Sequence, residues 1–266
     1  MNVPATIRLA VAVLVLLVAP GARATSSSID QSDIWWNPDE SGWGIQFVHR
    51  GNIIFATMFV YGPDHAATWF TSTMFGSAAK ASPAFAGDLI ASQGPGFATI
   101  PFDPTAVTRV KVGSMTWQPE SDASGVLAYS VNGVNVTKMI VREALVNDDY
   151  NGSYLIAFQG TQSGCSDASK NGTSSGSATL AIVQSASGVT MTEIASNSTC
   201  TLNGAYTQAG QFGSAAGTFS CSNGDTGTFT ISEMTVSPRT MTATLATASP
   251  SRGCHLLGNV AGVRTD

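Results

Sequence analysis

The sequence predicts an all-β protein built from two antiparallel β-barrel or β-sandwich modules. Turn-forming residues recur at intervals of about ten residues, short apolar runs alternate with polar positions, and no apolar repeat of a helical period follows the N-terminal stretch. Charged residues make up only 11% of the chain, while glycine, serine and threonine are abundant. Outward strand faces rich in hydroxyl groups would have this composition. Aromatic and β-branched residues are too plentiful for a disordered chain.

The first 24 residues have the layout of a secretory signal peptide. Arg8 supplies a short positive region, residues 9–19 form an unbroken apolar run, and Ala22-Arg23-Ala24 matches an A-x-A cleavage site. The run is shorter than the ~20 residues needed to span a bilayer, and no later stretch comes close. We therefore expect an exported chain, periplasmic or extracellular, that begins at residue 25 and has no integral membrane span.

Tryptophans and cysteines divide the mature chain into two modules. All five tryptophans lie in the first half and all four cysteines in the second, and the polar, turn-prone stretch 147–152 lies between them. The sequence therefore predicts a Trp-rich β module over 25–146 and a disulfide-containing β module over 147–266. For the first module we expect a meander like that of lipocalins or avidin.

Strand signals are present in both modules. Residues 53–61 are apolar at nearly every position, so both faces of that strand are expected to be covered. The pair Asn132-Gly133 predicts a two-residue hairpin turn. Residues 164–177, GCSDASKNGTSSGS, predict a loop by composition. The other predicted strands are 67–75, 107–117, 126–131, 134–141, 152–158, 178–184, 189–194, 202–208, 217–220, 227–231 and 240–245.

The four cysteines predict two disulfides. Their spacing contains no C-x-x-C, and an exported chain meets oxidising surroundings, so disulfides are favoured over zinc or redox chemistry. Of the three possible connectivities we favour Cys200–Cys221 with Cys165–Cys254. The stretch between Cys200 and Cys221 has the pattern of one hairpin turning at 210–213, which would bring these two cysteines opposite each other.

Charge and histidine content argue against several classes of function. The formal net charge is −5, and the basic residues are scattered rather than gathered into a patch that could neutralise phosphates, so no nucleic-acid binding is expected. His49, His65 and His255 show no metal-ligand spacing. No metal site or cofactor is predicted.

The stretch 34–44, IWWNPDESGWG, holds three of the five tryptophans. Trp43, between two glycines at the start of a strand, is predicted to plug one end of a barrel, as a tryptophan does in lipocalin-like barrels. Trp35 and Trp36 are neighbours and cannot both face the core of a regular strand, so one is expected at the mouth as a platform for a sugar or apolar ligand. The predicted ligand-binding residues are Trp35, Trp36, Glu40, Trp43 and Trp117.

The acids beside these tryptophans offer a hydrolase alternative. Asp39 and Glu40 are adjacent and would point in opposite directions on an extended chain, whereas a glycosidase needs two carboxylates that converge on one bond. Either acid could instead meet Glu120, which lies in a similar Trp-x-Pro-acid motif. Glu40 is otherwise expected to accept hydrogen bonds from the backbone at Ser41-Gly42. No catalytic residue is predicted.

The run WWNPDESGWG, followed by GNIIF at 51–55, MFVY at 58–61 and Trp69, resembles a set of uncharacterised secreted proteobacterial proteins with a WWNPxESGWG signature. The stretch 133–142, GVNVTKMIVR, is similar to the strand that closes their first module. Met58 stands where tryptophan is common in those proteins. The resemblance implies secretion and a shared first module, and it carries no activity.

Together these patterns predict an exported, non-enzymatic protein that binds a small molecule or glycan at the Trp-rich end of the first module. One alternative is an envelope structural or assembly module without a small ligand, and another is a hydrolase with a carboxylate pair. An open cavity with polar groups at its mouth would favour binding, a filled core with exposed apolar edges the structural role, and convergent carboxylates the hydrolase. Nothing in the sequence identifies a protein partner.

Overall fold

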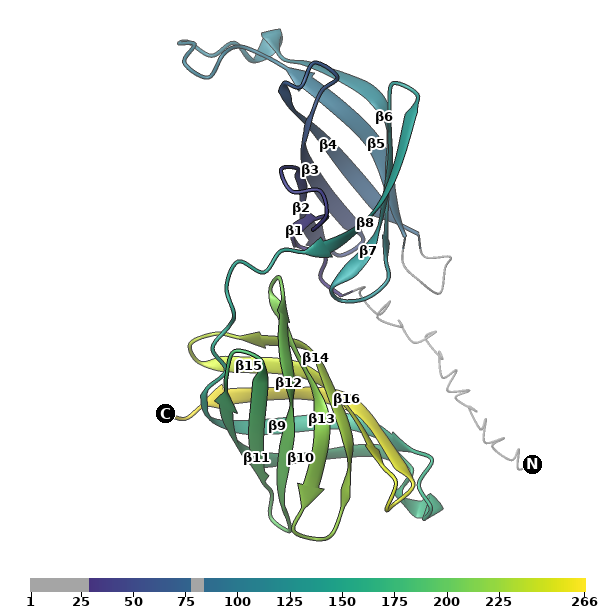
Figure 1. The fold of residues 1–266 in the computed structure, drawn as a ribbon, viewed down its shortest axis with the longest axis vertical. Coiled ribbons are helices and arrows are strands. Elements are labelled where there is room, and N and C mark those ends of the chain that lie inside the picture. The colour runs from purple at the N-terminus through teal and green to yellow at the C-terminus, as the bar shows by residue number, and fades with distance from the viewer. Residues whose placement is uncertain (1–28, 78–83) are drawn as a thin grey trace, which may run out of the picture.

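The computed structural model describes residues 29–77 and 84–266, and it contains two closed antiparallel barrels (Figure 1). The predicted signal peptide, residues 1–24, lies outside the described residues. In each barrel the strands follow chain order, and the last strand pairs with the first, β8 with β1 and β16 with β9. The all-β prediction is confirmed, both modules are barrels, and the meander expected of the first is the topology of both.

The strands of the first barrel are β1 (Asp33–Trp36), β2 (Gly44–Arg50), β3 (Ile53–Tyr61), β4 (Ala67–Gly76), β5 (Phe85–Gln93), β6 (Thr108–Pro119), β7 (Ser124–Val131) and β8 (Val134–Arg142). Those of the second are β9 (Gly152–Ser163), β10 (Gly172–Gln184), β11 (Gly188–Ile194), β12 (Thr199–Ala209), β13 (Phe212–Cys221), β14 (Thr226–Val236), β15 (Thr240–Ser249) and β16 (Cys254–Arg264).

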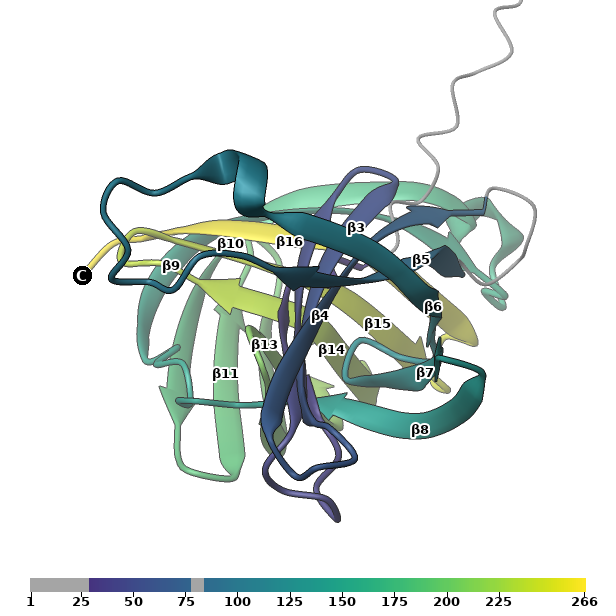
Figure 2. The same cartoon turned by 90° about the horizontal axis from the view of Figure 1, so that it is seen from above.

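Residues 143–151 join the barrels, and the boundary predicted between 146 and 147 falls in this segment. The β5–β6 loop, which carries the 3-10 turn η1 (Pro104–Ala106), stands away from the first barrel in both views (Figures 1 and 2).

The predicted turn at Asn132-Gly133 is confirmed, whereas the prediction for the faces of β3 is wrong. Asn132 and Gly133 both have positive φ, 49° and 87°, and form the predicted two-residue turn between β7 and β8. The expectation that both faces of β3 are covered is wrong. Met58 is fully buried, whereas Phe55 and Phe59 on the other face are 45% and 56% exposed. The apolar residues on the outer face of β3 are therefore exposed, and no second layer among the described residues covers them.

The predicted loop over 164–177 is half correct. Residues 164–171 form a loop with a 3-10 turn, η2 (Ala168–Lys170), but β10 begins at Gly172 and pairs with β9 from Gly172 opposite Gln162 onward. The first six residues of β10 are mostly exposed, so hydroxyl and glycine residues suffice on them. The composition of a solvated strand end was therefore mistaken for that of a loop.

Large aromatic side chains fill the first barrel. Trp35 and Trp117 are fully buried and meet edge to face with ring centroids 4.8 Å apart, and Phe47 lies 5.3 Å from Trp117. Buried Gln31 satisfies both indole N–H groups: its backbone carbonyl accepts from Trp35 at 3.0 Å and its side-chain carbonyl from Trp117 at 3.1 Å. The backbone N–H of Gln31 in turn donates to Nδ1 of His49 at 3.2 Å. The remaining buried apolar core residues of this barrel are Ile45, Ile54, Ala56, Met58, Met74, Phe85, Leu89, Met115, Leu127 and Ile140.

Tyrosines close one end of the second barrel. The hydroxyl of Tyr150 donates to the carbonyl of Met234 at 2.7 Å, and that of Tyr154 donates to the carbonyl of Tyr150 at 3.1 Å. Tyr206 packs against the Tyr150 ring at 5.9 Å. Burial raises the pKa of Tyr206 to about 12. These phenols stay neutral donors and acceptors at this end, which faces the first barrel.

Arg142 joins the two barrels. Its guanidinium donates to Asp33 Oδ2 at 3.1 Å and lies between the Trp35 ring of the first barrel, at 4.4 Å, and the Phe212 ring of the second, at 4.8 Å. Asp33 also accepts from the backbone N–H of Gln211 at 2.8 Å, at the tip of the β12–β13 hairpin. One fully buried arginine side chain thus contacts both cores.

In residues 29–77 and 84–266 we find no helix whose length and hydropathy would let it span a bilayer.

Candidate functional site

The structure separates the five predicted ligand-binding residues into two groups. Trp35 and Trp117 are fully buried inside the first barrel, where no ligand can reach them without opening it. Trp36 and Trp43 are half-buried and Glu40 is exposed. The latter three therefore remain the accessible part of the predicted site.

The prediction for Trp43 holds only in part: its half-buried ring packs against the edge of the first core, whereas the fully buried ring inside the barrel is that of Trp35. Trp35 lies within β1 opposite Ile45, and the pairing turns its ring into the barrel, whereas Trp43 precedes β2 and belongs to the turn that enters it. Its indole N–H donates to Glu40 at 2.9 Å, and the ammonium of Lys138 lies 5.3 Å from the ring centroid. Gly42, with a φ of 116°, belongs to the turn before β2, and the Trp43 ring that follows it packs on the edge of the core.

Glu40 has side-chain partners instead of the expected backbone N–H groups. It accepts hydrogen bonds from the Lys138 ammonium and the Trp43 indole, and these two bonds lower the pKa of its carboxyl. A carboxylate held ionised by a lysine is poorly suited to donate a proton to a leaving group. The geometry at Glu40 therefore gives the hydrolase alternative no support.

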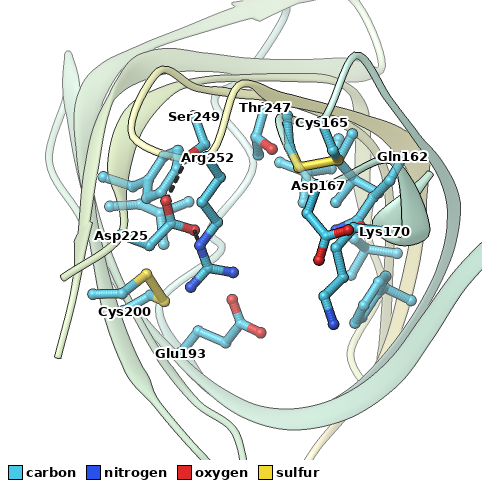
Figure 3. A pocket seen from close by; sticks show the side chains of 18 of the residues that line it. Gln162, Cys165, Asp167, Lys170, Glu193, Cys200, Asp225, Thr247, Ser249 and Arg252 are labelled. Carbon is cyan, nitrogen blue, oxygen red and sulfur yellow. Dashed lines mark hydrogen bonds and ion pairs between the residues drawn. A yellow bond between two sulfur atoms is a disulfide. The ribbon is translucent and has the colours of Figure 1, made fainter. Parts of the chain in front are cut away.

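A cavity of about 480 Å³ opens at the far end of the second barrel, away from its tyrosine-filled end (Figure 3). Such a volume is within the usual range for small-molecule sites. Its walls are mostly apolar, and both disulfides lie at its rim, Cys165–Cys254 and Cys200–Cys221. These are the two disulfides favoured from the sequence, and that prediction is confirmed. The apolar wall residues are Ile156, Phe158, Leu202, Phe219, Leu245, Leu256 and Val260.

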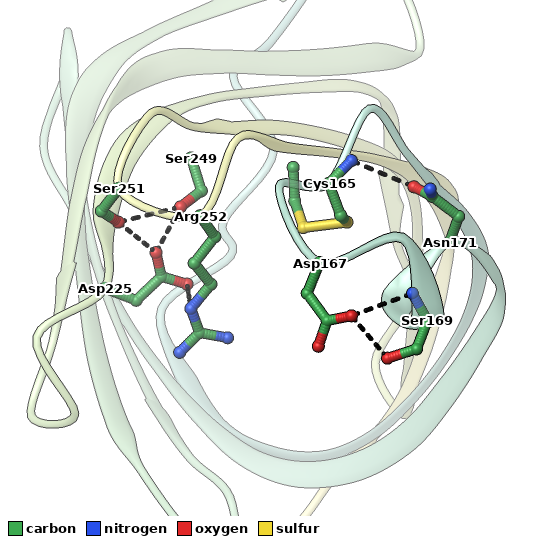
Figure 4. The surroundings of a disulfide bond; sticks show 9 residues. Cys165, Asp167, Ser169, Asn171, Asp225, Ser249, Ser251 and Arg252 are labelled. Carbon is green, nitrogen blue, oxygen red and sulfur yellow. Dashed lines mark hydrogen bonds and ion pairs between the residues drawn. A yellow bond between two sulfur atoms is a disulfide. The ribbon is translucent and has the colours of Figure 1, made fainter.

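One side of the rim is a closed polar network. Asp225 accepts hydrogen bonds from the hydroxyls of Ser249 and Ser251 and pairs with Arg252, whose Nε lies 3.2 Å from its Oδ2 (Figure 4). The carboxylate is thus already neutralised within the protein. Arg252 keeps the outer nitrogens of its guanidinium toward the opening (Figure 3).

The other side of the rim is the β9–β10 loop, tied down by a disulfide. The Cys165–Cys254 bond joins this loop to the start of β16, and the backbone N–H of Cys165 donates to Asn171 at 3.0 Å (Figure 4). Asp167 caps η2 by accepting from the backbone and hydroxyl of Ser169 at 3.0 and 2.7 Å. The loop also carries Lys170, which lines the opening. The disulfide and the cap together preform this side of the mouth.

Glu193 is the polar residue that departs most from its apolar surroundings. It lies on β11 in phase with buried Val189 and Met191, so its side chain enters the lumen (Figure 3). Burial raises the pKa of its carboxyl above the ordinary value. Within the described part of the chain, no hydrogen bond or salt bridge involves this carboxylate.

The sequence contains a signal for Glu193, which is absent from the predicted site residues. The run VTMTE at 189–193 puts an acid in register with two apolar residues, which marks an ionisable group facing a core. The cavity itself had no comparable signal, because its volume depends on how eight strands combine their inward side chains.

Comparisons with known proteins add no family. No protein-family model matches the chain, and none of the curated proteins matches it. In residues 29–77 and 84–266, no cluster of three or more histidine, cysteine, aspartate or glutamate side chains could hold a metal ion.

Proposed function

We propose that this protein is exported and binds a small, largely apolar molecule in the lumen of the second barrel. The observation that carries the proposal is the cavity of about 480 Å³, with apolar walls and a polar rim, in a barrel whose opposite end holds buried tyrosines. Such a cavity can remove most of the surface of a small ligand from water, while the rim orients it. Two disulfides support the export that the N-terminal sequence predicts.

The test is calorimetric titration of the full-length mature protein with a neutral apolar probe, 2-(1-naphthyl)ethanol. Thr247 lines the cavity, so Thr247→Phe should fill part of it and weaken binding without loss of thermal stability. Thr244→Phe puts the same side chain on the outer face of the same strand, where Thr244 contacts Asn259, and should leave binding unchanged. Binding that is equal in all three proteins, or absent from all, would refute the lumen as the site.

The Trp-rich end of the first barrel is a second candidate, for a glycan. Half-buried Trp43 donates to exposed Glu40, Trp36 is half-buried on β1, and an aromatic ring beside polar groups suits the stacking of a sugar. Lys138 already occupies part of the space over the Trp43 ring, which makes this site less open than the lumen. A glycan-binding screen in which Trp36→Ala and Trp43→Ala abolish capture, with the lumen variants unaffected, would favour it.

A further inference from the structure

Glu193 lies where the wide cavity meets the deeper part of the lumen. It lines the outer cavity and also a small inner pocket of about 40 Å³, whose other walls are apolar. Asp167 and Asp225 line the outer cavity alone. Glu193 is the charged residue among those that line both the outer cavity and the inner pocket, so its carboxylate lies beside the route into the barrel.

The charged residues around the cavity differ in their partners. Arg252 lies against Asp225 at 3.2 Å, and Lys170 is near enough to Asp167 to lower the pKa of its carboxyl further, beyond the effect of the Ser169 hydrogen bonds. Arg252 thus has a direct anionic partner, whereas Lys170 acts on Asp167 only at longer range. Glu193 has no such partner among the described residues, and no neighbouring cation opposes the effect of burial on its pKa.

An unpaired carboxylate facing an apolar lumen is unfavourable unless something compensates it. Burying a charge without a partner weakens the folded state, whereas a charge-assisted hydrogen bond in surroundings of low dielectric constant is strong. The partner that the protein does not supply can come from the ligand. A protonated amine would give Glu193 both a positive charge and N–H donors.

We infer that the lumen selects a ligand with a protonated amine on an apolar body, and that Glu193 binds the amine while the apolar walls bind the rest. This inference rests on the proposed function of the lumen and specifies its ligand class. An anionic ligand could reach Lys170 or the outer nitrogens of Arg252 at the rim, but deeper in the lumen it would bring its charge close to Glu193. Glu193 thus distinguishes amines from carboxylates.

The test compares three matched probes in calorimetric titrations near neutral pH and at low salt: 2-(1-naphthyl)ethylamine, 2-(1-naphthyl)ethanol and 1-naphthylacetate. The wild-type protein should bind the amine most tightly and the carboxylate least. Glu193→Gln keeps the shape of the side chain and removes its charge, so it should weaken amine binding roughly 10- to 100-fold, as for a lost hydrogen bond to a charged group. Its affinity for the alcohol should change little.

Two further variants make the comparison specific. Glu143→Gln removes the same charge beside the first barrel, outside the cavity, and should leave all three affinities unchanged. Glu193→Met, of similar length and without polar atoms, should lose the amine preference as Glu193→Gln does. If the carboxylate binds best, or if the amine preference survives in both Glu193 variants, the inference is overturned while binding in the lumen stands. If the alcohol does not bind at all, the proposed function itself fails.

Discussion

The two barrels have the same number of strands and the same order of connections, but their interiors differ. The first is filled by Trp35, Trp117, Phe47 and Phe85, all nearly inaccessible to solvent. The second has buried tyrosines toward one end, and toward its disulfide end a cavity of about 480 Å³ remains between the inward side chains. A closed eight-stranded barrel has room for side chains or for one small ligand. In this chain, the sizes of the inward residues decide between the two outcomes.

The barrels also differ in whether their inward charged side chains have partners. In the first barrel the buried Arg142 has a carboxylate, backbone carbonyls and two aromatic faces as partners. In the second, Glu193 enters the lumen without a partner in the described residues. A buried charge with every partner in place is typical of structure, and one that lacks a partner is typical of a binding site.

The largest expected effect is a loss of stability when a buried ring is removed from the first barrel. Trp35→Ala removes a fully buried ring that packs against Trp117 and Arg142, and should lower the free energy of unfolding by about 3–5 kcal/mol. Trp36→Ala, at the half-buried neighbouring position, should cost much less. Urea denaturation followed by circular dichroism measures both. Equal destabilisation by the two variants would contradict the assignment of Trp35 as the plug.

A smaller loss of stability is expected when a disulfide of the second barrel is removed. Replacing Cys165 and Cys254 by serine frees the β9–β10 loop and should destabilise the second barrel by about 2–5 kcal/mol, the usual range for a native disulfide of a small secreted domain. All five tryptophans lie in the first barrel, so tryptophan fluorescence reports on that barrel alone. We expect its transition to stay in place while the loss of β structure by circular dichroism begins earlier. A simultaneous shift of both signals would show that the barrels unfold as one unit.

The smallest effect concerns Glu193 and has a defined pH dependence. Because its pKa is raised on folding, the folded state holds the proton more tightly than the unfolded state, and this contribution is lost as pH rises through the folded pKa. Glu193→Gln should therefore melt at a higher temperature than the wild type at neutral pH, and the gain should vanish below the ordinary carboxyl pKa of 4.5. Asp167, Lys170, Asp225 and Arg252 also face the cavity but are unchanged in the variant, so the difference isolates Glu193. A variant that is less stable at neutral pH would show that the wild-type carboxylate is compensated.

Much of the fold was predictable because it depends on local chemistry. Asn132-Gly133 determined one hairpin, and the turn near Gly210 placed Cys200 opposite Cys221. The errors arose where tertiary context decides. The exposed start of β10 has the composition of a loop. No local pattern tells that Trp35 is the fully buried ring and Trp43 the half-buried one, since this depends on where β1 and β2 begin to pair. The location of the cavity depends on eight strands at once, whereas the tryptophan-rich end is visible in one short stretch of sequence.

The most direct test is methyl NMR of the mature protein titrated with 2-(1-naphthyl)ethanol, because the two barrels give separate sets of signals. If the second barrel is the binding module, shifts should concentrate on the lumen methyls of Ile156, Leu202, Leu245 and Val260, while Ile45, Ile54 and Leu127 in the first barrel stay unchanged. Shifts confined to the first barrel, or no shifts at saturating probe, would contradict the claim that its interior is structural and that the lumen of the second barrel binds the ligand.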